Sequence, residues 1–180
     1  SSSANHIYDV TVGYTTANSS SLHTQNAKKV NIYNQMAQVL FGYDENGAIR
    51  KFDSDGTIDG STTGQMEQCV FLNFSRLLSK DEIKKGSFQI AIGTASYNDP
   101  FSGIKTLSDA HVVEGNQQTF KTNSPMGEYA LLQNGTTATV PSTSSHGLLY
   151  YQAGLLVLFP NTSTFGSQLI SGSLFGLVDT

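Results

Sequence analysis

Residues 70–93, VFLNFSRLLSKDEIKKGSFQIAIG, constrain the fold of this 180-residue chain more than any other segment. Apolar side chains alternate with other residues at both ends of the segment, which is the two-residue period of half-buried β-strands. The alternating apolar positions are Val70, Leu72, Phe74, Phe88, Ile90 and Ile92. The segment therefore predicts two strands that flank a short basic turn.

The turn between these strands has the pattern of a capped helical turn. Ser79 precedes Glu82 by three residues, so the serine side chain can accept from the backbone N–H of Glu82 while the Glu82 carboxylate reaches back. Gly86 supplies a permissive residue at which such a turn can end. We expect one helical turn of about six residues here.

Three lysines, Lys80, Lys84 and Lys85, make this turn locally basic. They can dock an acidic neighbour. Alternatively, they form a solvated face, because Asp81 and Glu82 early in the turn and lysines late in it suit the helix dipole. The charge order favours the solvated face.

The N-terminal part of the chain also alternates. Tyr8, Val10, Val12 and Tyr14 fall on one face of a predicted strand, and the polar residues 15–21 end it. We expect this face to belong to the core. The alternative is that it completes the sheet of a neighbouring subunit by strand addition.

Helical periodicity is clearest between residues 25 and 41, which Gly42 follows as a terminator. The repeating apolar positions are Val30, Tyr33, Met36, Ala37 and Leu40. Near the other end of the chain, the apolar residues 148–159 predict one buried central strand. We therefore predict a mainly β (α+β) fold, an antiparallel sheet or sandwich-like domain with one amphipathic helix near residues 25–41.

The chain has the length of one principal domain. We assign residues 1–24 to an N-terminal strand and polar loop, 25–160 to the main β-rich domain and 161–180 to a C-terminal segment. The sequence starts at Ser1 rather than at Met. This start is consistent with a processed or excised part of a longer chain, into which the C-terminal segment would continue.

Composition limits the partners that we expect. The net charge is −4, with ten Lys plus Arg against fourteen Asp plus Glu, whereas binding to nucleic-acid phosphates requires a broad basic surface. The longest strongly apolar run, residues 153–159, is far shorter than the roughly 20 residues that span a bilayer. We expect neither nucleic-acid binding nor a membrane span.

We predict no metal, cofactor or catalytic residue. Cys69 is the only cysteine, the four histidines lack the paired spacing of zinc hydrolases, and no Gly-x-Ser-x-Gly elbow occurs. Asp53, Asp55 and Asp59 suggest a calcium loop, but the register of an EF-hand would place Lys51 at the first ligand position. A solvated Asp-Gly turn is the simpler interpretation.

Several short segments have sequences that are typical of one protein family. They are residues 7–14 (IYDVTVGY), 28–40 (KKVNIYNQMAQVL), 70–93, 101–109 (FSGIKTLSD), 127–132 (GEYALL) and 147–158 (GLLYYQAGLLVL). In this order, over roughly residues 6–160, the chain resembles virion structural proteins of large contractile-tailed (myovirus-type) bacteriophages. The resemblance implies a component of the particle and carries over no catalytic residue.

From this resemblance we expect a structural protein of the virion, in the tail, baseplate or fibre-attachment region, assembled in the host cytoplasm. Its partners would be other virion proteins and copies of itself. Two alternatives remain. One is a receptor- or glycan-binding module of a tail fibre that uses loops near Tyr97 and Phe120. The other is a tail-associated hydrolase with a pair of carboxylates that leaves little trace in sequence.

Overall fold

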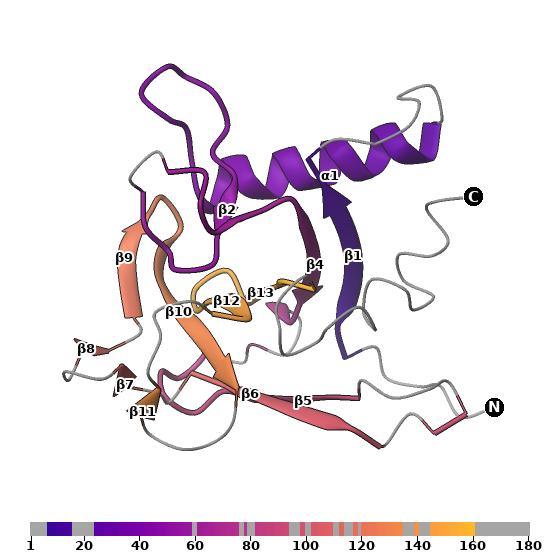
Figure 1. Ribbon diagram of the computed structural model, residues 1–180, viewed down its shortest axis with the longest axis vertical. Helices are drawn as coiled ribbons and strands as arrows, with labels where there is room; N and C mark the ends of the chain where they lie inside the picture. Colours follow the sequence, from indigo (N-terminus) through magenta and orange to yellow (C-terminus); the bar gives the residue numbers. More distant parts are fainter. Residues whose placement is uncertain are drawn as a thin grey trace.

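The structure, a computed structural model, describes residues 7–15, 24–58, 61–75, 78, 82–93, 98–99, 102–109, 112–113, 117–118, 120–134, 139–140 and 145–160. Strands dominate these ranges, and one helix, α1 (Thr24–Leu40), accompanies them (Figure 1). The predicted mainly β fold with a single helix is therefore confirmed for the described part of the chain.

Eight strands form one curled antiparallel sheet with the shape of a half-barrel (Figure 1). Its spatial order is β1 (Asp9–Tyr14), β4 (Gln68–Asn73), β13 (Leu155–Leu158), β12 (Gly147–Tyr150), β10 (Gly127–Asn134), β6 (Ile104–Ser108) and β5 (Gln89–Gly93). The eighth strand, β9 (Phe120–Ser124), pairs with β10 beside this path. The strands β1 and β5 are the two ends of the path.

Two small sheets accompany the large one. β2 (Phe52–Asp53) pairs with β3 (Gln65–Met66). In the other small sheet, β7 (Val112–Val113) lies between β11 (Thr139–Val140) and β8 (Gln117–Gln118).

The two strands predicted within residues 70–93 are present as β4 and β5, but they are not neighbours. β4 pairs with β1 and β13, whereas β5 pairs with β6 at the opposite end of the sheet. β5 shows the predicted alternation, with Ile90 and Ile92 more buried than the residues between them. β4 does not, because residues 69–72 are all buried. The prediction of a half-buried strand was wrong there, since both faces of β4 are covered.

Both faces of the sheet carry a core. The helix-side core includes Tyr33 and Leu40 of α1, Phe52 of β2, and Cys69 and Phe71 of β4. The strand-side core, on the other face, is built from sheet residues and from the turn between β12 and β13. Its buried members are Val70, Leu72, Leu107, Ala130, Leu132, Leu149, Tyr151, Leu156 and Leu158.

The predicted helix near residues 25–41 is confirmed as α1. It ends as expected at Gly42, which takes a φ of 84° and donates its N–H to the carbonyl of Ala37 at 3.0 Å. Tyr33, Ala37 and Leu40 are buried at the helical spacing that predicted them. No helix among the described residues is long and apolar enough to cross a membrane.

Close packing joins α1 to β1. A Cβ atom on Gly13 would lie 2.8 Å from the backbone nitrogen of Tyr33. The helix therefore approaches the inner end of β1 at backbone distance, and Figure 1 shows α1 crossing the sheet at the end of that strand.

Residues 148–159 form a hairpin rather than the single strand that we predicted. β12 and β13 pair with each other from Gly147↔Leu158 to Tyr150↔Leu155. Gly154 allows the turn between them, because its φ is 62° and its N–H donates to the Tyr150 carbonyl at 3.0 Å. Both strands are almost wholly buried. Their apolar residues therefore form a nearly continuous run in the sequence, and periodicity gave no sign of the turn between them.

Candidate interaction site at a sheet edge

β1 is an edge strand that pairs, among the described strands, only with β4. The Thr15 N–H donates to the Glu67 carbonyl at 2.9 Å, so these opposed residues form a hydrogen-bonded pair. Hydrogen-bonded pairs alternate along an antiparallel ladder. Gly13, Thr11 and Asp9 therefore direct their backbone groups toward β4, and the even-numbered residues direct theirs away from the sheet.

The outer end of β1 is exposed on both faces. Residues 7–11 are all exposed, with apolar side chains at Ile7 (53%), Tyr8 (45%) and Val10 (44%). The inner end is covered, since Val12 packs against the strand-side core and Tyr14 is buried. The prediction that the whole face from Tyr8 to Tyr14 lies in the core was therefore wrong.

The exposed end of β1 still has a fixed position. The ring of Tyr8 lies 5.6 Å from that of Phe74, and Phe74 lies 5.9 Å from Phe88, measured between ring centroids. By alternation along the strand, Tyr8 and Val10 lie on the same face as Val12, which packs against the strand-side core. The edge thus presents a short apolar row together with outward-directed backbone groups.

Within the described residues, this edge lacks three common features that prevent pairing with another chain. Natural edge strands are commonly blunted by Lys, by Pro or by a bulge. β1 has neither Lys nor Pro, its register with β4 is continuous from Asp9 to Tyr14, and Asp9 is its only charged residue. The arrangement is therefore suited to recognition through backbone hydrogen bonds.

The predicted basic turn is built differently from our expectation. Ser79 and Lys80 lie outside the described residues, and residues 82–88 form a bend and a turn without helical conformation. Gly86 has the predicted positive φ, 70°. Lys84 is exposed, and Lys85 forms an ion pair with Glu128. Glu82 is exposed too.

Asp109 holds the basic turn in place, a role that the sequence analysis missed. Its carboxylate is fully buried and accepts hydrogen bonds from the N–H groups of Gly86 (2.8 Å) and Phe88 (2.9 Å) and from the Tyr151 hydroxyl (2.8 Å). Burial, with the neighbouring Asp109 carboxylate, raises the pKa of Tyr151 well above its usual value. Because Asp109 follows β6 and its partners lie far away in sequence, periodicity carried no signal for it.

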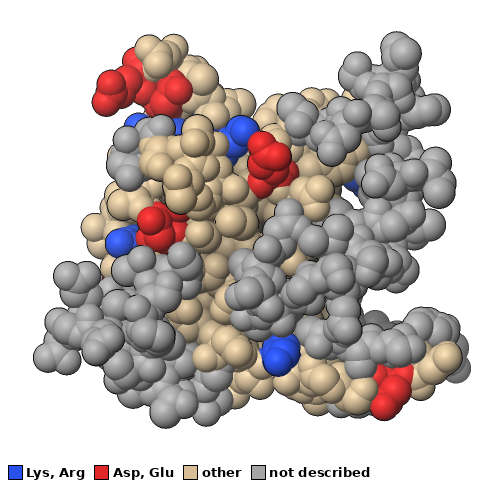
Figure 2. Space-filling model, in the orientation of Figure 1, with Lys and Arg blue, Asp and Glu red and all other residues tan. Residues whose placement is uncertain are grey.

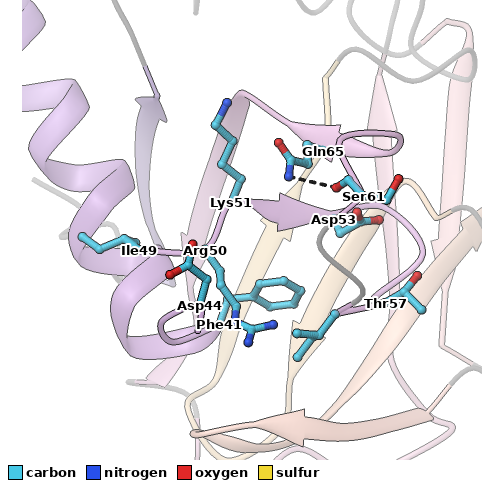
Figure 3. A pocket seen from close by; sticks show the side chains of 10 residues that line it. Phe41, Asp44, Ile49, Arg50, Lys51, Asp53, Thr57, Ser61 and Gln65 are labelled. Atoms are coloured by element: carbon cyan, nitrogen blue, oxygen red, sulfur yellow. Dashed lines mark hydrogen bonds between the residues drawn. The ribbon is translucent and has the colours of Figure 1, made fainter. Parts of the chain in front are cut away.

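A pocket of about 270 Å³ opens beside β2, on the face shown in Figure 3. Figure 3 places the side chains of Phe41, Asp44 and Arg50 on one side and those of Asp53 and Gln65 on the other. The Arg50 Nε donates to the Tyr43 carbonyl at 2.5 Å. Positively and negatively charged side chains, which can donate and accept hydrogen bonds, thus line a partly apolar pocket. Such a pocket is suited to a small uncharged polar ligand.

The predicted Asp-Gly turn lies beside this pocket. Asp53 accepts from the Asp55 N–H at 3.0 Å, and Asp55 accepts from the N–H of Thr57 at 2.8 Å and from its hydroxyl. Partial burial acts to raise the pKa of Asp55, but hydrogen bonds donated by Thr57, hydrogen bonding with Asp53 and the charge of Lys121 outweigh it and lower that pKa. Within the described residues no three His, Cys, Asp or Glu side chains are grouped to hold a metal; Asp59 lies outside those residues.

Charges are sparse on the face shown in Figure 2, where Lys and Arg form scattered spots, several of them beside Asp or Glu. Of the four histidines, His146 is described, and burial lowers its pKa. Tyr97, named above for a possible glycan site, lies outside the described residues, and Phe120 is half-buried against the strand-side core.

The geometry of the edge strand is thus the clearest indication of a functional surface. Compared with known protein families, curated proteins and solved structures, the chain matches none of them.

Proposed function

We propose that this protein is a structural component of a tailed bacteriophage virion, in the tail, baseplate or fibre-attachment region, that acts through protein–protein contacts repeated in many copies. The observation that carries the proposal is the exposed edge of β1, where Ile7, Tyr8 and Val10 are each exposed by more than two-fifths. The bacteriophage setting rests on the sequence resemblance described above.

The phrases of that resemblance lie largely in the framework of the domain. Residues 7–14 contain β1, residues 28–40 lie in α1, and residues 147–158 contain the β12–β13 hairpin. A framework with an exposed edge strand can form such contacts, and a symmetric particle repeats each contact and gains from avidity. Individual contacts can then be weak and still yield a stable assembly.

Mass spectrometry of purified phage particles tests this proposal directly. We expect the chain to be present in mature virions in many copies, and electron microscopy should place it at a site rich in contacts with other proteins. Absence from the particles, with presence in infected-cell lysate, would remove the structural role.

A small-glycan-binding module is a second candidate, because the pocket beside β2 combines polar donors and acceptors with apolar walls. Such a module would recognise a host-surface sugar. NMR titration with neutral monosaccharides should then perturb the amides of Arg50 and Thr57 in a saturable way. An Arg50→Ala variant should abolish the perturbation, whereas Lys105→Ala, on β6, should not.

A further inference from the structure

We propose that the partner of β1 is β1 of a second copy of this chain. The two strands would pair antiparallel about a two-fold axis that passes through Val10, joining two half-barrel sheets into one. This inference rests on the proposed function, since it names one of the repeated contacts of that assembly.

The backbone of β1 limits which registers are possible. Tyr8, Val10 and Val12 direct their N–H and C=O groups away from β4, as the hydrogen-bonded pair of Thr15 and Glu67 requires. A second strand can bond fully only if its own outward-directed residues lie opposite these. For two identical antiparallel strands, this condition allows an axis at Asp9, at Val10 or at Thr11.

Side chains select among these three registers. An axis at Asp9 would place two carboxylates directly opposite each other, which destabilises a strand pair. An axis at Thr11 would bring the second strand against Tyr14, which is buried at the end of β1 where α1 crosses. An axis at Val10 avoids both problems.

In the register centred on Val10, each exposed residue lies opposite a compatible residue of the second strand. Val10 faces its own copy, and Tyr8 faces Val12, so apolar side chains meet apolar side chains. On the other face of the strand, Asp9 lies opposite Thr11, whose hydroxyl can donate to the carboxylate. The same patch thus serves both subunits, as a two-fold contact requires.

Pairing would also extend the strand-side core. Val12 packs against that core, and the Tyr8 ring contacts Phe74, which packs at its margin. The even-numbered side chains of a second β1 would continue this apolar surface across the axis. The contact is short, so we expect a weak dimer that is reinforced where other contacts hold the copies together.

Disulfide trapping measures the register. Val10→Cys places two thiols in opposed residues about 5.5 Å apart between Cα atoms, a separation at which a disulfide can form. Cys69 is fully buried and does not compete. We expect Val10→Cys to give a covalent dimer on mild oxidation, and to do so faster than Asp9→Cys or Thr11→Cys, which report the two rejected registers.

Proline substitution separates pairing from folding. The N–H of Val10 points away from β4, so Val10→Pro should abolish dimerisation in analytical ultracentrifugation with little change in Tm. Thr11→Pro, the matched control, removes an N–H that bonds to β4 and should lower Tm. If Val10→Pro also lowers Tm, Val10→Lys replaces it as the variant that blocks the edge.

The outcomes distinguish this inference from the proposed function. A monomer at millimolar concentration together with no cross-linking of Val10→Cys would overturn the self-pairing, and faster cross-linking of Asp9→Cys or Thr11→Cys would overturn the register. Neither result bears on whether particles contain the chain. Conversely, a Val10-centred dimer that is absent from virions would support this inference and reject the virion role.

Discussion

The two faces of the half-barrel sheet are closed in different ways. On the helix side, α1 and the β2 region seal a core whose members include Tyr33, Phe41 and Phe52, all nearly inaccessible. No helix among the described residues covers the strand side. Both buried cores are bordered by partly buried apolar residues. On the strand side these are Val12, Phe74, Ile83, Phe88, Ile90, Ile92 and Phe120, and on the helix side they include Ile32, Met36, Met66 and Leu155.

The two faces are covered by elements that lie at different distances from the sheet strands in sequence. An amphipathic helix directly after β1 covers the helix side with one local element. The strand side depends on long-range contacts, chiefly the hydrogen bonds of Asp109 to the turn at Gly86 and Phe88. The even-numbered side chains of β1, among them the partly buried Val12, lie on this side of the sheet.

Truncation of a central ring on the helix side should have the largest effect. Phe52 is fully buried and packs against the rings of Tyr33, Phe41 and Phe71 at centroid distances of 5.5, 5.9 and 5.8 Å. Phe52→Ala should lower the free energy of unfolding by about 3–5 kcal/mol, because it leaves a cavity that the neighbours cannot fill. Denaturant titration measures this loss.

The matched control is the same truncation at the margin of the strand side. Phe120 is half-buried and lies 6.0 Å from the ring of Tyr151, so Phe120→Ala should cost less, about 1–2 kcal/mol. Equal losses for the two variants would contradict the distinction between a fully buried centre and a half-buried margin.

Removing the charge of Asp109 should weaken the strand side next most strongly. In Asp109→Asn, an amide group replaces one carboxylate oxygen, so that at least one of the donors on Gly86, Phe88 and Tyr151 loses its acceptor. We expect a loss of about 2–3 kcal/mol, with faster hydrogen exchange at the amides of Gly86 and Phe88. Asp99→Asn, at an exposed site, is the control and should change neither quantity.

Adding one methyl group at the contact between α1 and β1 should destabilise the protein. Gly13→Ala places a Cβ atom 2.8 Å from the Tyr33 backbone, which should push the helix away at a cost of about 1–3 kcal/mol. Gly86→Ala should cost about 1 kcal/mol through its positive φ alone, because a Cβ there meets no atom within 4 Å. Thermal melts of the two variants compare steric with conformational cost.

The smallest expected effect is a dependence on pH through His146. Burial lowers its pKa in the folded state, so between the folded value and the unfolded value of about 6.5 the unfolded chain binds more protons. Stability should therefore fall as the pH drops below about 6.5. Comparing His146→Gln with the parent chain from neutral pH to pH of about 5 should show a flatter profile in the variant.

Asp55 provides a check on the pH range over which stability changes. Its pKa is lowered in the folded protein, so its contribution is present above the unfolded value of about 3.9 and is lost only at lower pH. A loss of stability in the parent chain that begins near pH 4, with none above it, would point to carboxylates and contradict the role of His146.

Side-chain periodicity was informative wherever one element packs with one face. It predicted α1 from Tyr33, Ala37 and Leu40, and it predicted β5 from Ile90 and Ile92, because in each case only one face is covered. It failed at β4 and in the β12–β13 hairpin, where burial on both faces removes the alternation. Gly154, which allows that hairpin turn, was the available signal.

The candidate site was predicted only in part. Tyr8, Val10, Val12 and Tyr14 were assigned to one face, but the sequence did not reveal where along it burial ends. That boundary depends on distant segments: Val12 packs against the strand-side core and Tyr14 is buried, whereas Tyr8 and Val10 stay exposed. The role of Asp109 was likewise hidden, because its three partners come from two other segments of the chain.

The sequence by itself determined the mainly β class, the position of the helix and its end at Gly42, because these depend on local periodicity and on backbone freedom at single residues. Only the tertiary structure decided the strand order, the two cores and the open edge at β1. Strand pairing joins residues such as Val12 and Val70 that lie far apart in the chain. Local patterns indicate which residues are candidates for burial, whereas the packing of distant elements decides which of them are buried.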